Sequence, residues 1–393
     1  MFDDTGVLIV GSGHTPFGRL DALNLEQLIV MAANEAIEDA GIDPAEIDAV
    51  YLGHFNAGLV PDAFASSLIH QAHPALRFKP AVRCENACAS GSAAIHAGLR
   101  AIQSRAARTV LVIGVEKMTS RTTPEVTEAL ACAGYKNDPR ESGLSFPQQF
   151  ARVAQAYAER YQDPLPVMAA IAAKNHGNAM RNPLAQLRRE LDTAFCNAVS
   201  DRNPMIAAPL RMTDCSPISD GAAAIVMTCE RRAPRHARQV RFRAATHVSD
   251  MLPLEGRDLL AFEGPHRAMQ RAYAEAGVQL QDLDFAEVHD CFTISELLIY
   301  EAMGLAAPGE GHRVLDDGTV QRDGDLPVNL SGGLKAKGHP VGATGVSMHA
   351  LAYRQLTGRA GDMQCPGAEL GLVFNMGGMA VANYASVLEA VRA

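Results

Sequence analysis

The segment NACASGSAA (86–94) places a cysteine where a thiol could act as a nucleophile. Cys88 stands on a turn of small residues that opens a helix pattern, and backbone N–H groups at such a helix start stabilise a thiolate. We therefore expect the pKa of Cys88 to be lowered. The Ala, Ser, Gly and Ser residues that follow would let a substrate carbonyl approach the backbone. A structural cysteine in the core is an equally good interpretation of this segment on its own.

The segment SGGLKAKGHPVGATG (331–345) holds a histidine on a glycine-rich loop. His339 lies between Gly338 and Pro340, so its ring can present one nitrogen in a fixed direction. The loop lacks the Gly-Lys-Ser or Gly-Lys-Thr ending of a phosphate-binding P-loop. If His339 lies near Cys88, it would accept the thiol proton, as in Cys–His nucleophilic catalysis. A solvated loop histidine is the alternative interpretation.

The segment EVHDCFT (287–293) brings three chemically versatile residues together after a strand-like approach. These are His289, Asp290 and Cys291. A zinc site is a weak interpretation, because neighbouring residues on an extended chain point to opposite faces and no second ligand cluster has metal spacing. The other interpretation is a strand end with a cysteine in the core. The role of this segment therefore depends on what surrounds it.

A repeated pattern predicts the elements that position these segments. Residues 25–55 and 264–292 each read as a helix, a turn and a buried strand. Residues 88–102 and 342–356 each read as a small-residue turn that opens a helix, and a candidate buried strand follows both. Two such echoes in the same order indicate an internal duplication.

The duplication divides the chain into two halves, 1–235 and 236–393. Strands that alternate with helices predict mostly parallel sheets with helices outside. The first half has a polar, proline-punctuated excess at about 118–215, which we interpret as an inserted loop domain that holds substrate over one face of the core. Several of its basic residues could meet phosphates, although a solvated surface explains each at least as well: Lys174, Arg181, Arg188, Arg189 and Arg211.

Composition excludes several classes of protein. The net charge of −9 argues against nonspecific nucleic-acid binding, and no apolar run of about 18 residues predicts a membrane span. The first residues lack the features of a signal peptide, and the ending EAVRA is not a peroxisomal address. Eight cysteines without a C-x-x-C pair indicate reduced thiols and a cytoplasmic location rather than a disulfide framework.

The three segments, in this order and spacing, resemble the thiolase superfamily, in particular its sterol-carrier-protein type and acetyl-CoA acetyltransferase-like members. The resemblance covers essentially the whole chain, from VGSGHTPFG (10–18) to NMGG (375–378), and GHPVGATG is its most specific motif. It implies an α/β thiolase-like fold in which two duplicated βαβαβαββ halves form a layered α-β-α-β-α core. The inserted loop domain would then cover coenzyme A.

The resemblance also implies roles for individual residues. Cys88 would accept an acyl group from acyl-CoA, and His339 would be the base that activates it, so that 3-ketoacyl-CoA is made by Claisen condensation or cleaved by thiolysis. In many thiolases a second acid/base is the cysteine of a C-x-G motif, but Asn375 stands at that place here and cannot carry the proton. In the sterol-carrier type the cysteine of an HDCF motif takes over, and Cys291 matches it.

Oxyanion sites follow from the same resemblance. One would use His339 and His289 through a water, and the other would use the backbone N–H groups of Cys88 and Gly377. Asp290 would orient its turn. The substrates would be acyl-CoA and CoA, with no tightly bound cofactor and no metal, and the protein would be a homodimer or higher oligomer.

Four other functions stay open. The first is a C-acyltransferase subunit that acts on a non-CoA acceptor beside a small OB-fold acyl-CoA-binding partner. The second is an aldolase-like relative, against which the presence of both Cys88 and Cys291 argues. The third is a non-catalytic lipid or acyl-CoA binder, which would not need all three reactive residues. The fourth is a metal-binding protein built on His289 and Cys291.

Overall fold

The computed structural model describes residues 6–233 and 238–391, so the predicted division between 235 and 236 lies outside the described residues. Nine strands form one hydrogen-bonded sheet in the order β3-β2-β4-β7-β1-β8-β11-β10-β9, and β5 and β6 form a separate pair. The strands are β1 (Val7–His14), β2 (Ala49–Gly53), β3 (Ala81–Cys84), β4 (Thr109–Glu116), β5 (Met205–Ala207), β6 (Leu210–Arg211), β7 (Gly221–Cys229), β8 (Gln239–Ser249), β9 (Phe285–Val288), β10 (Leu370–Gly377) and β11 (Ala382–Val391).

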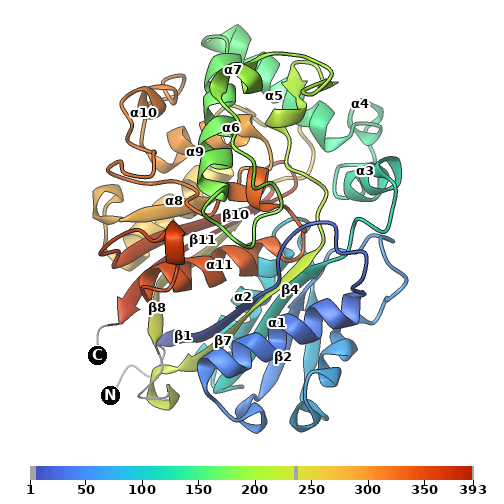
Figure 1. Ribbon diagram of the computed structural model, residues 1–393, viewed down its shortest axis with the longest axis vertical. Coiled ribbons are helices and arrows are strands. Elements are labelled where there is room, and N and C mark those ends of the chain that lie inside the picture. Colours follow the sequence, from blue (N-terminus) through green and yellow to red (C-terminus); the bar gives the residue numbers. More distant parts are fainter. Residues whose placement is uncertain (1–5, 234–237, 392–393) are drawn as a thin grey trace.

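The α-helices alternate with these strands and also fill the insertion (Figure 1). They are α1 (Leu25–Ala40), α2 (Ser90–Gln103), α3 (Thr123–Ala131), α4 (Pro139–Ser142), α5 (Phe146–Arg160), α6 (Leu165–Ala179), α7 (Thr193–Asn197), α8 (Glu263–Ala276), α9 (Thr293–Met303), α10 (Arg313–Asp316) and α11 (Thr344–Leu356). No helix among the described residues is both long enough and apolar enough to cross a membrane.

Sheet order shows the duplication directly. The order β3-β2-β4-β7-β1 in one half is mirrored by β8-β11-β10-β9 in the other, and the two halves join where β1 pairs with β8. An isolated bridge between Val328 and Ala286 lies where a counterpart of β3 would pair with β9. The helices α1 and α8 occupy equivalent places, and each ends at a glycine in the left-handed conformation, Gly41 and Gly277.

The prediction of mostly parallel sheets is wrong. Among the described strands of the large sheet, parallel pairing is confined to β2 with β3 and β4, and to β9 with β10. The other neighbours in the large sheet are antiparallel. In the second half the reason is local, because β10 and β11 follow each other through a connection too short for a parallel crossover.

The predicted layering is confirmed. Along β1, Val7 and Ile9 belong to one apolar cluster while Leu8 and Val10 belong to another, so both faces of the strand are covered. The outer cluster includes the apolar face of α1, and α8 takes the corresponding outer place on the second half. The helices α2 and α11 pack against each other between the two halves. The layers are therefore α1, the first half of the sheet, the helices α2 and α11, the second half of the sheet, and α8 (Figure 1).

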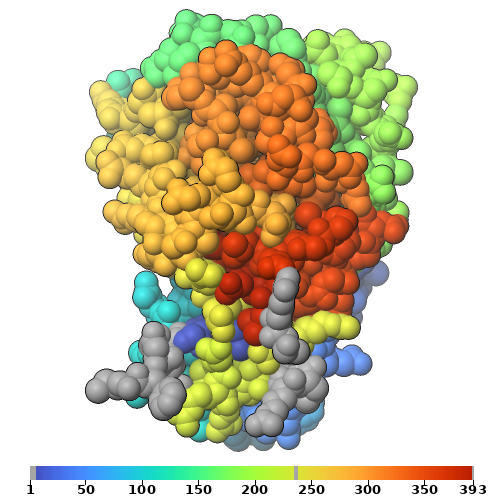
Figure 2. All heavy atoms as spheres, turned by 90° about the vertical axis from the view of Figure 1, so that its left-hand side faces the viewer, coloured from blue at the N-terminus to red at the C-terminus, as the bar shows by residue number. Residues whose placement is uncertain are grey.

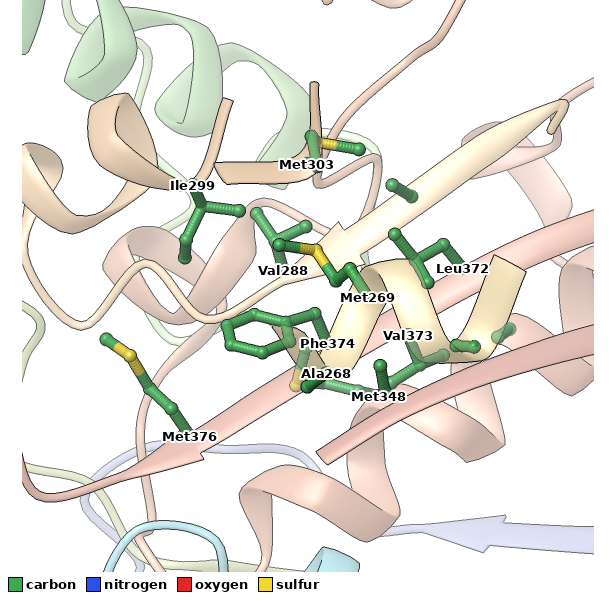
Figure 3. Packing of buried hydrophobic residues seen from close by; sticks show 14 of the residues in the cluster. Ala268, Met269, Val288, Ile299, Met303, Met348, Leu372, Val373, Phe374 and Met376 are labelled. Carbon is green, nitrogen blue, oxygen red and sulfur yellow. The ribbon is translucent and has the colours of Figure 1, made fainter. Parts of the chain in front are cut away.

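The core of the second half fixes two strands that lead into reactive residues (Figure 3). Val288 from β9 and Phe374 from β10 are buried together with Met348 from α11. His289 and Asn375 are the next residues of the chain. Because Val288 and Phe374 pair across the two parallel strands, His289, which follows the end of β9, lies beside Asn375, which is still within β10.

The insertion begins and ends at paired residues of the sheet. Glu116 at the end of β4 pairs with Gly221 at the start of β7, and α3 to α7 lie between them. Figure 2 shows this segment, in green, next to the second half, in orange. Buried contacts fasten it there: Lys174 of α6 forms an ion pair with Glu296 of α9 at 2.9 Å. The insertion is thus largely helical and packs against the second half.

Candidate active site

A strained turn between β3 and α2 presents Cys88. Ala87 has φ of +51°, a left-handed conformation that alanine rarely adopts. The hydroxyl of Ser90 donates to the carbonyl of Ala87 at 2.6 Å and accepts the N–H of Asn86 at 2.9 Å. The side-chain amide of Asn86 donates to the hydroxyl of Tyr384 at 2.7 Å. These bonds stabilise the turn and direct the thiol into the cavity.

The small residues after Cys88 have a role in packing. Gly91 is buried, and a Cβ on it would lie 2.9 Å from both the carbonyl oxygen of Gly342 and the N–H nitrogen of Val346. A Cβ on Gly53 would likewise meet the Cα of Gly91 at 2.6 Å. Glycine is therefore needed for close packing of α2 against β2 and against the start of α11. This packing brings the Cys88 and His339 loops of the two halves together.

The expectation of a lowered pKa at Cys88 is wrong. Burial raises the pKa of Cys88 to about 12, and the charge of Glu116 raises it further. The backbone N–H groups of Gly378 and of Cys88 itself act in the opposite direction, but desolvation of the thiolate outweighs them. Cys88 is therefore a neutral thiol at rest and needs a base to remove its proton.

Hydrogen bonds define which nitrogen of His339 is basic. Its Nδ1 lies 2.7 Å from the hydroxyl of Thr344, and that hydroxyl donates its single proton to the carbonyl of Pro340. Thr344 must then accept from Nδ1–H, so the lone pair is on Nε2. The backbone N–H of His339 donates to Ser219 at 2.9 Å. Burial lowers the pKa of His339 to about 3, so the ring is neutral at rest and its Nε2 lone pair is free.

His289 has the opposite tautomer. Its Nδ1 lies 2.8 Å from the side-chain nitrogen of Asn375, while the side-chain oxygen of Asn375 accepts the hydroxyl proton of Ser92 at 2.7 Å. Nδ1 of His289 is therefore an acceptor and Nε2 carries the hydrogen. Burial, with the nearby His339 and Lys337, lowers the pKa of His289 well below its usual value. One histidine thus offers a lone pair and the other an N–H.

One cavity of about 640 Å³ unites four of the five predicted site residues: Cys88, His289, Cys291 and His339 all line it. The thiol sulfur of Cys88 and a ring nitrogen from each histidine lie within 4.8 Å of one another. The rings of His289 and His339 meet edge to face with centroids 5.1 Å apart. Residues separated by up to 251 positions in the chain are therefore neighbours in space, as the resemblance implied.

Cys291 lies at the junction of β9 and α9. The residue is buried, and its sulfur lies 3.8 Å from the hydroxyl of Ser295. Burial raises the pKa of the Cys291 thiol well above its usual value, and the neighbouring Cys88 adds to this effect. Cys291 is thus held as a protonated thiol on the wall of the same cavity.

Asp290 is not among the residues that line this cavity, and it joins two segments. Its carboxylate accepts the backbone N–H groups of Leu334 at 2.6 Å and of Lys335 at 3.1 Å, and the side-chain amide of Asn175 at 2.8 Å. Burial and the charge of Glu296 raise the pKa of Asp290 to about 7. Asp290 therefore connects the strand end of His289 to the turn that leads to His339.

Gly377 packs against the Cys88 turn, whereas its neighbour Gly378 lines the cavity. A Cβ on Gly377 would lie 3.3 Å from the backbone nitrogen of Ala89, so glycine lets β10 approach the Cys88 turn. The backbone N–H that contacts the thiol of Cys88 belongs to Gly378, and Gly378 rather than Gly377 is among the described residues that line the cavity. Gly378 was not predicted from the sequence, although the motif NMGG offers both glycines.

The basic residues that were predicted as possible phosphate ligands lie in different environments. Lys174 and Arg211 are not available for coenzyme A phosphates, because each is buried in an ion pair, with Glu296 and Asp214 respectively. Arg189 lines the cavity and is exposed, and so is Arg202, which was not predicted. Arg181 and Arg188 are exposed and lie outside the residues that line the cavity.

Glu116, also missed, holds the two halves together beneath the site. Its carboxylate accepts the N–H of Gly342 at 3.0 Å and the N–H of Phe55 at 3.0 Å. It therefore ties the His339 loop to the strand ends of the first half. A lone glutamate at the end of an apolar strand gave no signal of this contact, because its partners are remote in sequence.

The geometry disfavours the metal hypothesis built on His289 and Cys291. Among the described residues, the group with metal-ligand spacing is Cys88, His289 and His339, and Cys291 is not part of it. A metal needs a lone pair from each histidine. His289 could offer one toward the cavity only if the amide of Asn375 gave up its present hydrogen bonds.

Two family models together match most of the chain. The model for the thiolase N-terminal domain matches residues 7–231, and the model described as thiolase C-terminal domain-like matches residues 245–390.

Individual proteins are similar over nearly the same length. The chain is 38% identical over 375 residues to the acetyl-CoA acetyltransferase of Methanothermobacter thermautotrophicus, covering 95% of this chain and 96% of the relative. It is 31% identical over 393 residues to sterol carrier protein 2 of Oryctolagus cuniculus, covering 94% of this chain and 70% of the relative. Among solved structures, the Ltp2–ChsH2(DUF35) aldolase has a TM-score of 0.83 at 22% identity and covers 99% of this chain and 98% of its own.

Proposed function

Because the chain belongs to the thiolase family, we propose that it transfers acyl groups between acyl-CoA molecules through an acyl-Cys88 intermediate. It would make 3-ketoacyl-CoA by Claisen condensation or cleave it by thiolysis. The observation that carries this proposal is the single cavity in which Cys88, His339, His289 and Cys291 meet. Each of them has the protonation state that its step requires.

The first half-reaction of thiolysis uses Cys88, His339 and Cys291. Nε2 of His339 takes the thiol proton of Cys88, and the thiolate attacks the 3-keto carbon. The bond between C2 and C3 breaks, and the C2 carbanion takes the proton of Cys291. Acyl-CoA leaves while the remaining acyl group stays on Cys88. Burial supports the start of this sequence, since it keeps Cys291 protonated and His339 neutral.

The second half-reaction restores all three groups. The thiol of free CoA gives its proton to the Cys291 thiolate and attacks acyl-Cys88. The Cys88 thiolate leaves and recovers its proton from His339. Condensation is the same sequence in reverse, so Cys291 then removes the α-proton of the second acyl-CoA.

Oxygen charge develops at two places and needs donors that are already oriented. The Nε2–H of His289 and protonated His339 would serve the thioester enolate. The backbone N–H of Cys88, with Gly377 as predicted from the sequence or its neighbour Gly378, would serve the tetrahedral oxyanion. Contact between the Gly378 N–H and the thiol favours Gly378. The exposed Arg189 and Arg202, at the mouth of the cavity, would meet the phosphates of coenzyme A.

The proposal is tested by incubating the protein with acetyl-CoA and then with longer acyl-CoAs, and locating the acyl group by peptide mass spectrometry. We expect the acyl group on the peptide that contains Cys88, and its loss when free CoA is added. Absence of label with every acyl-CoA, or label that free CoA does not remove, would contradict the proposal.

Asn375 gives a separate prediction, because it determines the tautomer of His289. Replacing Asn375 with leucine should lower kcat up to about 100-fold, somewhat less than the loss of a whole oxyanion donor, with a smaller change in KM. The ¹⁵N chemical shifts of the His289 ring should show loss of the single tautomer. Ser92→Ala, which only loosens the Asn375 amide, should give a smaller loss. Unchanged kcat and unchanged shifts in Asn375→Leu would remove this role.

A second candidate function is a C-acyltransferase subunit that works on a non-CoA acceptor with a small OB-fold acyl-CoA-binding partner. The solved structure reported above at TM-score 0.83 is an aldolase complex with a DUF35 component, which is the observation that favours a partner. An acceptor screen with and without such a protein distinguishes the two functions. If acyl transfer to CoA without a partner protein is faster than transfer to any other acceptor, the result favours the thiolase.

We also propose that two copies associate through β3. This strand forms one edge of the large sheet. Val82 on β3 is 52% exposed, and Phe78 just before it is 86% exposed. Exposed apolar side chains on an open sheet edge favour pairing with another chain. The cysteine turn follows β3 directly, so such a contact would support the site.

A further inference from the structure

Lys335 is a buried cation on the wall of the reactive cavity. Lys335 lies on the turn Gly333–Lys337 and is 3% exposed. Its backbone N–H donates to Asp290, while its side chain is among those that line the cavity with Cys88 and Cys291. Much of the rest of the wall is apolar, including Phe146, Phe150, Leu191 and Ile206.

The ammonium group of Lys335 has no hydrogen-bond or ion-pair partner among the described residues. The other three buried lysines differ: Lys117 pairs with Asp220, Lys174 with Glu296, and Lys337 donates to Ser347.

Nearby carboxylates are already engaged. Asp214 binds the guanidinium of Arg211 at 2.7 Å and accepts the hydroxyl proton of Thr293 at 2.8 Å. Asp290 accepts two backbone N–H groups and the amide of Asn175. Neither is bonded to the ammonium of Lys335. An unpaired buried charge is unfavourable, so this amine suits a ligand that brings its own negative charge.

The position of Lys335 separates it from the phosphates of coenzyme A. Burial lowers the pKa of Lys335, and the nearby thiol of Cys215 acts in the opposite direction. The backbone of Cys215 forms a β-bridge with Phe292, the residue after Cys291. The next residue, Ser216, donates its N–H to the carbonyl of Cys291 at 3.0 Å. Lys335 therefore lies near the reacting end of the cavity, whereas the exposed Arg189 and Arg202 lie at its mouth.

We propose that Lys335 binds a carboxylate carried by the acyl group of the substrate. The preferred substrates would then be CoA thioesters of dicarboxylic acids, or of keto acids with a second carboxylate. This inference rests on the proposed function for the CoA part of the substrate. A carboxylate paired with the Lys335 ammonium in an apolar wall gains a strong charge-assisted hydrogen bond, and a neutral acyl group of equal length leaves the ammonium without a partner.

Binding measured in a Cys88→Ala background tests this inference without requiring any acyl transfer. Calorimetry would compare succinyl-CoA with butyryl-CoA and glutaryl-CoA with valeryl-CoA. We expect the carboxylate to tighten binding about 10- to 100-fold, as for hydrogen bonds to charged groups. Adding Lys335→Met should abolish this preference, and Lys335→Arg should retain most of it. Lys337→Met removes a buried charge two residues away that does not line the cavity, and should retain the preference.

Three outcomes would overturn the inference. One is equal affinity for the charged and neutral members of each pair. Another is an equal loss for all four ligands in Lys335→Met, which would indicate a contact to the coenzyme A part. The third is failure of every acyl-CoA to bind, which would overturn the proposed function as well. Label on Cys88 from neutral acyl-CoA, together with no preference for the carboxylate, would leave the proposed function intact and remove only the role of Lys335.

Discussion

Cys88→Ala should lose all acyl label and at least about 10⁴-fold in turnover, as expected when a covalent nucleophile is removed. No neighbouring thiol can substitute. Cys291 lines the same cavity, but its thiol is buried and strongly protonated, and its neighbour Ser295 is a hydroxyl rather than a base. The N–H of Gly378 and the Nε2 of His339 are directed to the place of Cys88, so an acyl group elsewhere would lack both.

Cys84→Ala is the matched control. Cys84 ends β3 four residues before Cys88, is partly buried, and burial raises its pKa to about 11. It does not line the cavity. Label and turnover should therefore stay within a few-fold of the parent protein, measured by peptide mass spectrometry and by release of free CoA. Label that persists in Cys88→Ala would disprove the acyl-cysteine intermediate at this residue.

The protonated resting state of Cys88 explains why turnover also depends on His339. The sequence predicted both residues, because each lies in a distinctive local motif. It did not predict their resting state. The helix start at Cys88 favours a lowered pKa, but the enclosure of the thiol by both halves raises it instead. Burial is a property of the whole fold, whereas the helix start can be read from nine residues.

Other residues show the same division between local and long-range information. The helices α1 and α8 and the strands β9 and β10 were predictable, since their apolar periodicity and glycine ends are local. Parallel or antiparallel pairing was not, because it depends on how each strand returns to the sheet. Arg211 resembled a candidate phosphate ligand in sequence, but Asp214 three residues away pairs with it in the core. Lys335 was not predicted as a site residue, because its lack of a partner is visible only in the folded structure.

Asn375 is the most informative of these residues. From the sequence it marked the place where a second catalytic cysteine is missing. The structure adds that its amide binds Nδ1 of His289, so it fixes the hydrogen on Nε2. Asn375 and the HDCF segment are therefore coupled, and the replacement of cysteine by asparagine fits the use of His289 as a donor.

Cys291→Ala should separate the two halves of the reaction. The transfer of an acyl group from acyl-CoA to Cys88 needs no proton at an α-carbon, and it uses Cys291 only to protonate the departing CoA thiolate. Because water can protonate that stable thiolate instead, label on Cys88 should still form, with a much smaller loss of rate than the C–C steps. Condensation and cleavage both need a proton at C2. Their rates should fall by about 10²–10⁴, the usual contribution of a positioned acid or base. Single-turnover measurements of label, beside steady-state measurements of 3-ketoacyl-CoA, distinguish these steps.

Cys215→Ala is the control for this prediction, since Cys215 lines the same cavity and its pKa is also raised, to about 12, by burial. It should condense and cleave within a few-fold of the parent protein. Normal turnover by Cys291→Ala would show that another group carries the C2 proton. Of the remaining cavity groups, His339 already holds the proton of Cys88 during the C–C step, and His289 has its Nδ1 occupied by Asn375. Cys291 can both give and regain a proton without disturbing either histidine.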